Sequence, residues 1–299
     1  MSNNDTVSPD QPTKLAWNYR RNKAKAILTL QGILDGVQAD KHLNDVETVF
    51  LRAWQDNDIF SLNDGDFVDI REQIDDILED GVITHDELDD IQSMLSTILE
   101  YNDLEDGGYE STVNHLLGFL SGISVDEELN DFEIRKLSTL LNGDPELASK
   151  WPANAIKNRV DEILEDDVIE DRERDDLLNL IKAVSGQSLM DSGLAYGMSA
   201  DFSTKDNADI CLSGKSVCFT GKFLSGSRST QQQRAEALGA SVKKNVTKTL
   251  DILVLGAVAS RDWRYSSYGR KIEGALEHRM NGGDIEIINE EIWNELIKA

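Results

Sequence analysis

Cysteine is scarce in this sequence, with two residues among 299. Cys211 and Cys218 cannot build a disulfide framework or a cysteine-based zinc site. The sequence also contains no apolar run as long as a membrane-spanning helix, and its polar start lacks the apolar core of a signal peptide. These absences predict a cytoplasmic protein without a membrane span.

The sequence motifs of common catalytic centres are missing as well. It contains no Lys-x-Asp-Gly adenylation motif, no P-loop, no HExxH zinc motif, and no Ser/His/Asp or Cys/His grouping. His42, His85 and His115 share no spacing that would place them together as metal ligands on one helix. The sequence therefore predicts a protein that is not an enzyme and needs no cofactor.

Charge divides the chain into two unequal parts. Residues 1–209 contain 17 Lys and Arg against 46 Asp and Glu, a net charge of −29. Residues 210–299 contain 13 against 10, a net charge of +3. Such an asymmetry within one chain points to different partners for the two parts. The acidic runs are most simply solvated helix faces, and the alternative is a surface that mimics DNA.

The acidic part contains an internal repeat with a constant offset of 86 residues. Apolar residues three and four apart, with acidic residues between them, predict helices throughout. Residues 30–47 and 116–133 are identical at nine of 18 aligned positions, and residues 74–91 and 160–177 at ten of 18. Neither alignment needs a gap. The pattern predicts a duplicated all-α unit of about four helices.

The predicted domains follow from this repeat. A polar tail at residues 1–13 is expected to be disordered. The first helical unit spans 14–101, the second spans 109–187, and a linker at 188–212 leads to the C-terminal domain at 213–299. The short acidic turns between paired helices resemble those of small tellurite-resistance B-like helical domains. The expected helices lie at residues 15–37, 44–56, 66–80, 84–100, 110–123, 129–142, 153–166 and 169–185.

One Asp-rich turn of the first unit raises the alternative of a calcium site. Asp76, Asp80 and Glu87 fall at positions 1, 5 and 12 of an EF-hand loop. Leu78 stands at position 3, however, and has no oxygen that could bind the ion. We favour the simpler interpretation of two helices joined by a tight turn, in which Thr84 and Glu87 form a capping box.

The C-terminal part has the alternating strands and helices of a parallel α/β fold. A short apolar run at residues 217–219 predicts a buried strand, which ends at Thr220 and Gly221. Ligands of parallel sheets bind beyond the carboxyl ends of the strands, and a hydroxyl beside a backbone N–H suits a phosphate there. The expected strands lie at residues 215–219, 241–244, 251–255 and 285–288, and the helices at 228–239, 268–280 and 289–298.

Several stretches of this part resemble a BRCT domain. The matching stretches are FTG at residues 219–221, ALGASV at 237–242, DILVLG at 251–256, and Trp293. The resemblance is to the single module at the end of bacterial NAD-dependent DNA ligases and in the large subunit of replication factor C. It implies a four-stranded parallel sheet flanked by three helices, with Trp293 in the core.

The resemblance also implies a phosphate site. In family members that bind phosphate, a Ser or Thr and a Gly after the first strand act with a Lys at the start of the second helix, and Thr220, Gly221 and Lys271 match them. The replication-factor-C type, which grips the 5′-phosphate of a duplex end, has an Arg eight residues after the Thr, where this sequence has Arg228. These groups suit one dianion. The alternative is that each serves only a turn or a solvated helix end.

Basic and aromatic residues are interleaved around the expected site. Such interleaving suits contact with a nucleic-acid backbone and stacking on its end. Trp263, Tyr265 and Tyr268 belong to the connection at residues 257–268, which we expect to determine specificity. The residues expected to contact the DNA backbone are Lys222, Lys243, Lys244, Lys248, Arg264 and Arg270.

The leading hypothesis is a non-enzymatic bacterial or phage protein whose BRCT domain binds DNA, preferably at 5′-phosphorylated ends or nicks, in repair, replication or defence. The acidic helical domain would recruit an unidentified protein partner, or fold back and mask the basic face. The alternative is an adaptor that binds a phosphopeptide or a protein and not DNA. Phosphopeptide binding usually needs two BRCT modules, and homodimerisation would supply the second.

Overall fold

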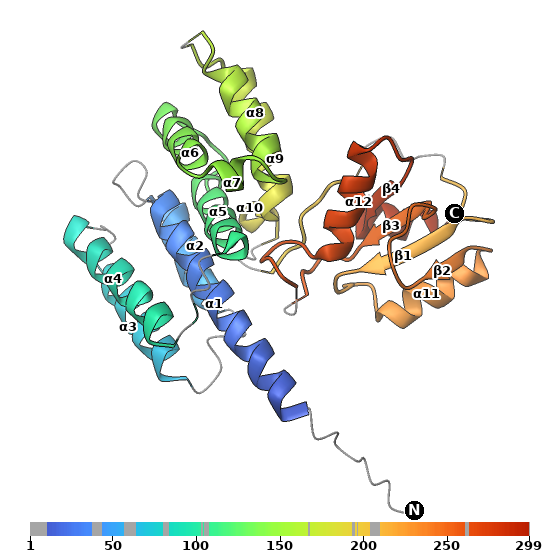
Figure 1. Cartoon of the computed structure of the whole chain (residues 1–299), viewed down its shortest axis with the longest axis horizontal. Coiled ribbons are helices and arrows are strands. Elements are labelled where there is room, and N and C mark those ends of the chain that lie inside the picture. Colours follow the sequence, from blue (N-terminus) through green and yellow to red (C-terminus); the bar gives the residue numbers. More distant parts are fainter. Residues whose placement is uncertain are drawn as a thin grey trace, which may run out of the picture.

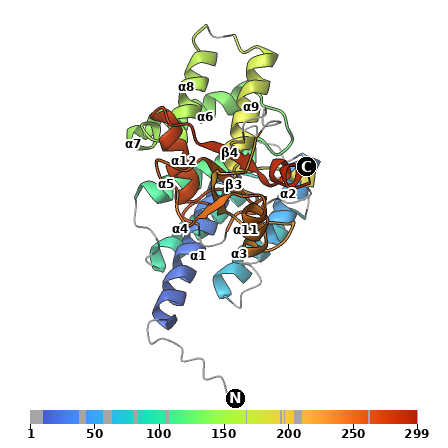
Figure 2. The same cartoon turned by 90° about the vertical axis from the view of Figure 1, so that its right-hand side faces the viewer.

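The computed structural model places a helical part, α1 to α10, beside a part built on a parallel sheet (Figure 1; turned by 90° in Figure 2). None of the described helices is both long and apolar enough to cross a membrane. The structure describes residues 11–299 except for residues 38–43, 57–63, 80–83, 103, 105–107, 167, 193–194, 196, 204–209, 261–262 and 299, and it describes only the backbone of residues 11–17 and 191–192.

The helical part confirms the predicted all-α class and the order of its main helices. The first unit comprises α1 (Gln11–Val37), α2 (Asp45–Gln55), α3 (Gly65–Ile77) and α4 (His85–Tyr101). The second comprises α5 (Tyr109–Ile123), α6 (Asp131–Gly143), α7 (Pro145–Ala148), α8 (Ala153–Ile163) and α9 (Asp171–Ser185), and α10 (Leu189–Ser192) follows it. The short α7 and α10 were not predicted. Because α1 begins at Gln11, the prediction of a disordered tail is wrong for residues 11–13, and residues 1–10 lie outside the described residues.

The two units also share the way in which their helices are capped. At the start of two helices in each unit, a glutamate in the first turn accepts a hydrogen bond from the backbone N–H that precedes the helix. Such reciprocal caps satisfy N–H groups that have no partner within the helix. The four pairs are Asn44–Glu47, Thr84–Glu87, Asn130–Glu133 and Glu170–Glu173, with N–H to oxygen distances of 2.8, 2.9, 2.8 and 3.0 Å.

The two units meet where α1 crosses α5, through glycines that occupy equivalent positions of the repeat. A Cβ atom on Gly32 would lie 1.9 Å from the carbonyl oxygen of His115, and one on Gly118 would lie 2.0 Å from that of Thr29. These two contacts are the same contact with the units exchanged, so the interface has an approximate two-fold symmetry. Gly36 and Gly122 repeat the relationship, each with a Cβ position 3.1 Å from the Cα of the other.

The second unit shares its hydrophobic core with the C-terminal domain, whereas the first unit has a core of its own. Phe50, Trp54 and Phe67 belong to the core of the first unit and are almost fully buried. In a second cluster, Leu116 and Leu177 of the second unit are continuous with buried residues of the sheet and its loops. The two parts of the chain therefore pack together through apolar side chains.

The C-terminal domain is a four-stranded parallel sheet with the strand order β2-β1-β3-β4, which confirms the predicted fold class. Apolar residues alternate between its two faces, so that Phe219 and Val254 share one face with Trp293, while Cys218 and Leu253 share the other with Ile272. The elements are β1 (Ser216–Thr220), α11 (Arg228–Ala237), β2 (Ser241–Lys243), β3 (Ile252–Leu255), α12 (Arg270–Met280), β4 (Glu286–Asn289) and α13 (Glu290–Leu296).

The segment expected to be a linker is in fact tied to both parts of the chain over residues 197–201, the connecting segment. The N–H of Asp201 donates to the carbonyl of Ala183 in α9, at 2.9 Å. The N–H of Ser199 donates to the carbonyl of Ala257, which follows β3, also at 2.9 Å. Since its backbone is paired on both sides, this stretch does not behave as a free tether.

Candidate phosphate site and nucleic-acid interface

Thr220 and Gly221 lie at the carboxyl end of β1, in the middle of the sheet. Thr220 is 4% exposed and its carbonyl accepts the N–H of Gly256 at 2.8 Å. Gly221 has a φ of +84°, and a Cβ atom there would lie 3.0 Å from the carbonyl oxygen of Gly256. Only glycine adopts this backbone conformation readily, so the sharp bend after β1 depends on Gly221.

Two cations reach the same bend from the starts of two helices. Arg228 is the first residue of α11, and its Nη2 donates to the carbonyl oxygen of Gly221 at 2.7 Å. Lys271 is in the first turn of α12, and its Nζ donates to the carbonyl oxygen of Phe219 at 3.0 Å. The two positive side chains thus bind the carbonyl groups on either side of Thr220.

The hydroxyl of Thr220 makes no hydrogen bond within the described part of the chain, although the residue is nearly buried. A hydroxyl, a left-handed glycine, a guanidinium and an ammonium therefore surround the end of β1, next to the first turns of α11 and α12. The structure thus brings together the four residues of the predicted phosphate site: Thr220, Gly221, Arg228 and Lys271. Helix N-termini and cations of this kind can bind an anion.

Glu290, which the sequence analysis missed, holds the loops around this site. It is 5% exposed, and its carboxylate accepts the N–H of Leu224 at 3.0 Å, the N–H and the hydroxyl of Ser225 at 2.6 Å each, and the N–H of Ala257 at 3.0 Å. Burial alone would raise the pKa of Glu290, but these hydrogen bonds outweigh it and lower the pKa below its usual value. An acidic residue two positions after the last predicted strand, and directly after β4, was the available signal.

Four of the predicted DNA-contacting residues lie on the same edge of the sheet as Thr220. Lys222 directly follows Gly221, and Arg270 begins α12. Lys243 ends β2 and pairs in register with Cys218, so it lies beside the carboxyl half of β1, and Lys244 follows it. All four side chains are exposed.

The structure separates Lys248 from this group. Lys248 precedes Thr249, whose carbonyl accepts the hydroxyl of Ser216 at 3.1 Å, and Ser216 begins β1. Lys248 therefore lies at the amino edge of the sheet, opposite the edge that carries Thr220. The turn between β2 and β3 reverses the chain direction, and for that reason closeness in sequence to Lys243 did not predict closeness in space.

Arg264 and the neighbouring aromatic residues have a different role from the one expected. The Nε of Arg264 donates to the carboxylate of Glu110 in α5 at 2.7 Å. Tyr265 and Tyr268 are fully buried, with ring centroids 4.4 Å apart, and Tyr268 also packs edge-on against Trp151 at 4.6 Å. The proposal that these tyrosines stack on a DNA end is therefore wrong, because the helical part covers them.

The β3–α12 loop, residues 256–269, is mainly a contact with the helical part rather than an exposed recognition loop. The N–H of Ser266 donates to the side-chain oxygen of Asn114 at 3.1 Å, and the hydroxyl of Ser267 donates to the carbonyl of Val184 at 2.7 Å. Lys25 of α1 donates to the carbonyl of Trp263 at 2.9 Å. These partners lie more than 80 residues away in sequence, so no local pattern revealed them.

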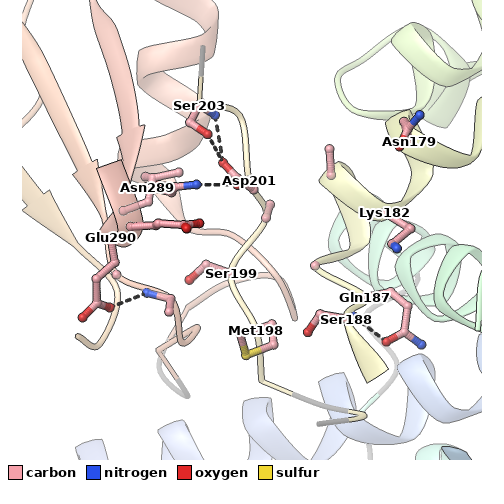
Figure 3. Close-up of a pocket in the computed structure, with 17 residues that line it drawn as sticks. Asn179, Lys182, Gln187, Ser188, Met198, Ser199, Asp201, Ser203, Asn289 and Glu290 are labelled. Carbon is pink, nitrogen blue, oxygen red and sulfur yellow. Dashed lines mark hydrogen bonds between the residues drawn. The ribbon is translucent and has the colours of Figure 1, made fainter. Parts of the chain in front are cut away.

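A cavity of about 520 Å³ lies between α9, the connecting segment and the ends of β3 and β4 (Figure 3). Its polar wall is largely paired internally: Asn289 donates to Asp201 at 2.9 Å, Lys182 pairs with Glu127, and the Glu290 carboxylate is already bonded. The cavity was not predicted. Its walls come from both parts of the chain, which again places the second helical unit against the carboxyl end of the sheet.

The weak calcium alternative gains no support. Glu87 caps α4 by accepting the N–H and hydroxyl of Thr84 at 2.9 and 2.7 Å, as the capping-box interpretation predicted. Asp76 lies near the end of α3, and Asp80 is outside the described residues. Among the residues that the structure describes, no group of three or more His, Cys, Asp or Glu side chains could hold a metal ion.

Comparison with known proteins identifies the C-terminal part. The BRCA1 C Terminus (BRCT) domain family matches residues 207–280. A DNA ligase of Anaplasma phagocytophilum (strain HZ) is 38% identical over 88 residues, which are 29% of this chain and 11% of that ligase. A DNA ligase of Parvibaculum lavamentivorans is 38% identical over 92 residues, or 31% of this chain and 11% of that ligase. A DNA ligase of Orientia tsutsugamushi (strain Boryong) is 35% identical over 89 residues, again 11% of its length.

The matched region is confined to one domain. The chain spans about a tenth of the length of these ligases, 11% in each alignment described, and the alignments cover 29–31% of this chain. No solved structure matches the chain. The sheet order, the buried Trp293 and the family match agree with one another, and this chain therefore carries a BRCT domain at residues 207–280.

Proposed function

We propose that this protein is a non-enzymatic DNA-binding adaptor whose BRCT domain binds the 5′-phosphate of a DNA end or nick. One observation carries the proposal: Arg228 and Lys271, 43 positions apart in the sequence, both hydrogen-bond to the carbonyls that flank Thr220. Turns and solvated helix ends do not require two cations at one bend, whereas two cations would bind a phosphate dianion through strong charge-assisted hydrogen bonds.

The chemistry of the site matches a terminal phosphate better than an internal phosphodiester. A terminal phosphate carries nearly two negative charges at neutral pH, and a phosphodiester carries one. A guanidinium, an ammonium and two helix N-termini together supply about the charge that a dianion needs. The hydroxyl of Thr220 can donate a further hydrogen bond, because no described group competes for it.

The exposed cations on the same edge of the sheet extend this site into a path for the DNA backbone. Lys222, Lys243, Lys244 and Arg270 would contact internal phosphates, and each contact would release counterions. Arg264 and Lys248 are not part of this path. The four path residues are exposed in the presence of the packed helical part, which favours partner recruitment by the acidic domain over masking of the basic face.

Binding of the full chain to a short duplex, with and without a 5′-phosphate, tests the proposal. We expect the phosphate to increase affinity, and Lys271→Ala to reduce that preference roughly ten- to hundredfold, as for loss of a hydrogen bond to a charged group. Lys248→Ala is the matched control, since it removes the same charge at the opposite edge and should leave the preference unchanged.

A salt series distinguishes the backbone path from the phosphate site. Lys222→Ala should reduce the slope of log affinity against log salt by about 0.9 while preserving the preference for a 5′-phosphate. A wild-type affinity that is the same with and without the 5′-phosphate would contradict the proposed function. In that case, binding of a phosphoserine peptide by the same chain would identify the adaptor alternative.

A further inference from the structure

The candidate phosphate site lies next to the contact between the helical part and the BRCT domain. We propose that the packed helical part positions this site, so that recognition of the 5′-phosphate depends on that contact. The inference rests on the proposed function and adds a means of regulation to it. Two structural connections join the helical part to the site. One runs through the β3–α12 loop and the other through the connecting segment.

The first connection leads along the β3–α12 loop to Lys271. Tyr268 is fully buried between Tyr265 and Trp151, so this point of the loop is fixed by the second helical unit. The next residue, Gly269, is the N-cap of α12, and a Cβ atom there would lie 2.7 Å from the ring of Trp263. Lys271 follows two positions later. The loop residues held by the helical part therefore set where α12 begins and where Lys271 points.

The second connection leads through the connecting segment to Gly221. Met198 forms an antiparallel bridge with Val258, and Val258 forms another with Lys222, which exchanges two hydrogen bonds with it at 2.7 and 3.1 Å. Gly221 lies directly before Lys222, and its Cβ position is 3.2 Å from the carbonyl oxygen of Val258. Backbone pairing through Met198, Val258 and Lys222 thus joins the connecting segment to the bend that carries the candidate phosphate site.

The helical side of the contact is held by specific polar groups. Arg264 pairs with Glu110, and the side chain of Asn114, which is 1% exposed, binds the N–H of Ser266. The contact also has a weakness, because the buried hydroxyls of Tyr265 and Tyr268 have no hydrogen-bond partner. Water would satisfy both hydroxyls if the contact opened, so the contact is one that can separate.

This arrangement couples two surfaces of the protein. A partner that displaced the loop from α5 would release Tyr268 and Met198 together and loosen both connections to the phosphate site. By linkage, DNA with a 5′-phosphate would strengthen the contact between the two parts to the same degree. A protein partner of the helical domain would then weaken phosphate recognition without touching the phosphate.

Charge reversal of the Arg264–Glu110 pair in the full chain provides the test. Arg264→Glu and Glu110→Arg each create a like-charge pair, and the double variant restores opposite charges. The measured quantity is the ratio of affinities for phosphorylated and unphosphorylated duplexes, because the ratio removes the general effect of a changed net charge on DNA binding. We expect each single variant to reduce the ratio by roughly tenfold and the double variant to recover most of it.

Two further variants complete the design. Arg159→Glu applies the same charge reversal to the pair that Arg159 forms with Asp176 at 3.0 Å, on α8 and α9, and should leave the ratio unchanged. Asn114→Ala removes the acceptor for the Ser266 N–H without changing charge, and should reduce the ratio as the single reversals do. Hydrogen exchange at the amides of Ser266 and Ser199 reports whether the contact has opened.

The outcomes separate this inference from the proposed function. A wild-type ratio near one would contradict the proposed function itself. A wild-type preference for the phosphate that survives in Arg264→Glu and in Asn114→Ala would overturn the positioning role alone. The positioning role would be established by a lower affinity ratio and faster amide exchange in the single variants, together with recovery of the ratio in the double variant.

Discussion

Glu290 binds Ser225 through both the backbone N–H and the hydroxyl, at 2.6 Å each, across the loops that border the candidate phosphate site. These two hydrogen bonds fix the loop between β1 and α11, and Arg228 directly follows this loop. A nearly buried carboxylate with four hydrogen bonds is costly to alter, because its partners would lose theirs. Glu290 is therefore a structural requirement for the site rather than one of its ligands.

The first prediction concerns this carboxylate. Glu290→Gln should lower the free energy of unfolding by about 1–3 kcal/mol, since an amide cannot accept all four hydrogen bonds. It should also weaken binding of 5′-phosphorylated DNA, because the loop before Arg228 loses its support. Chemical denaturation measures the first effect. Glu291→Gln, at the exposed neighbouring position, is the control and should change neither quantity.

The second prediction concerns Gly221. Gly221→Ala should destabilise the protein by about 1–2 kcal/mol, because φ is +84° there and the new Cβ would press on Gly256 and Val258. Gly274→Ala, inside α12 with no atom within 4 Å of its Cβ position, should instead be neutral or stabilise by about 0.5–1 kcal/mol. Equal effects of the two substitutions in a denaturation series would contradict the assigned conformation.

The third prediction addresses the crossing of the two helical units. Gly118→Ala should destabilise by about 3 kcal/mol or more, because its Cβ would lie 2.0 Å from the backbone carbonyl of Thr29, which cannot move without shifting α1. Gly143→Ala, where the Cβ position has no atom within 4 Å, serves as the matched control. Thermal unfolding of both variants measures the difference, and a mild effect of Gly118→Ala would contradict the close crossing.

The fourth prediction contrasts two buried tyrosines. The hydroxyl of Tyr268 has no partner, and burial raises its pKa well above the usual value. Tyr268→Phe should therefore leave stability unchanged or increase it by about 1 kcal/mol. Tyr109→Phe should decrease stability by about 1 kcal/mol, because the Tyr109 hydroxyl donates to the carbonyl of Trp151 at 2.8 Å. A denaturation experiment should therefore show a loss of stability for Tyr109→Phe and none for Tyr268→Phe.

The fifth prediction is a pH dependence at Asp251. Hydrogen bonds from the N–H and the hydroxyl of Ser216, together with Lys215, lower the pKa of Asp251 to about 2. The contribution of Asp251 to the free energy of unfolding is complete above the ordinary aspartate pKa of about 3.9. This contribution is lost as the pH falls toward 2. The carboxylate is 35% exposed, so solvent screening limits the contribution to about 1 kcal/mol or less.

Stability measured between pH 5 and pH 2 checks this dependence, in wild type and in Asp251→Asn. The substitution should lower stability at pH 5, and the two curves should converge at the acidic end. A constant difference across the range would show that Asp251 does not titrate in the folded state as described. Asp284→Asn, at an exposed position, is the control and should follow the wild-type curve.

Local patterns were sufficient to predict the fold class and the main helices and strands, but not the short helices α7 and α10. The run at 217–219 and the run at 252–255 are fully buried strands, and a short apolar stretch between turn residues identifies such strands from sequence alone. The four residues of the candidate phosphate site also converge, because the ends of parallel strands and the starts of the following helices meet at one edge of a sheet.

The contact between the two parts could not be predicted in the same way. Tyr265 and Tyr268 are separated by two serines in a loop, and their burial depends on Trp151 and Asn114 of another domain. The role of Glu290 depends on backbone N–H groups from two separate loops, which carry no side-chain signature. Tertiary partners of this kind shape the surroundings of the candidate site, and a single sequence does not reveal them.

The crossing of α1 and α5 has a consequence for stoichiometry. A symmetric homodimer presents every docking surface twice and would carry two BRCT domains. In this chain the two halves of such a pair are joined, and they differ at the contact with the BRCT domain. Asn114 of the second unit binds the BRCT loop, whereas the equivalent position of the first unit is Leu28. The two-fold helical scaffold therefore holds a single BRCT domain, packed against the second unit in one orientation.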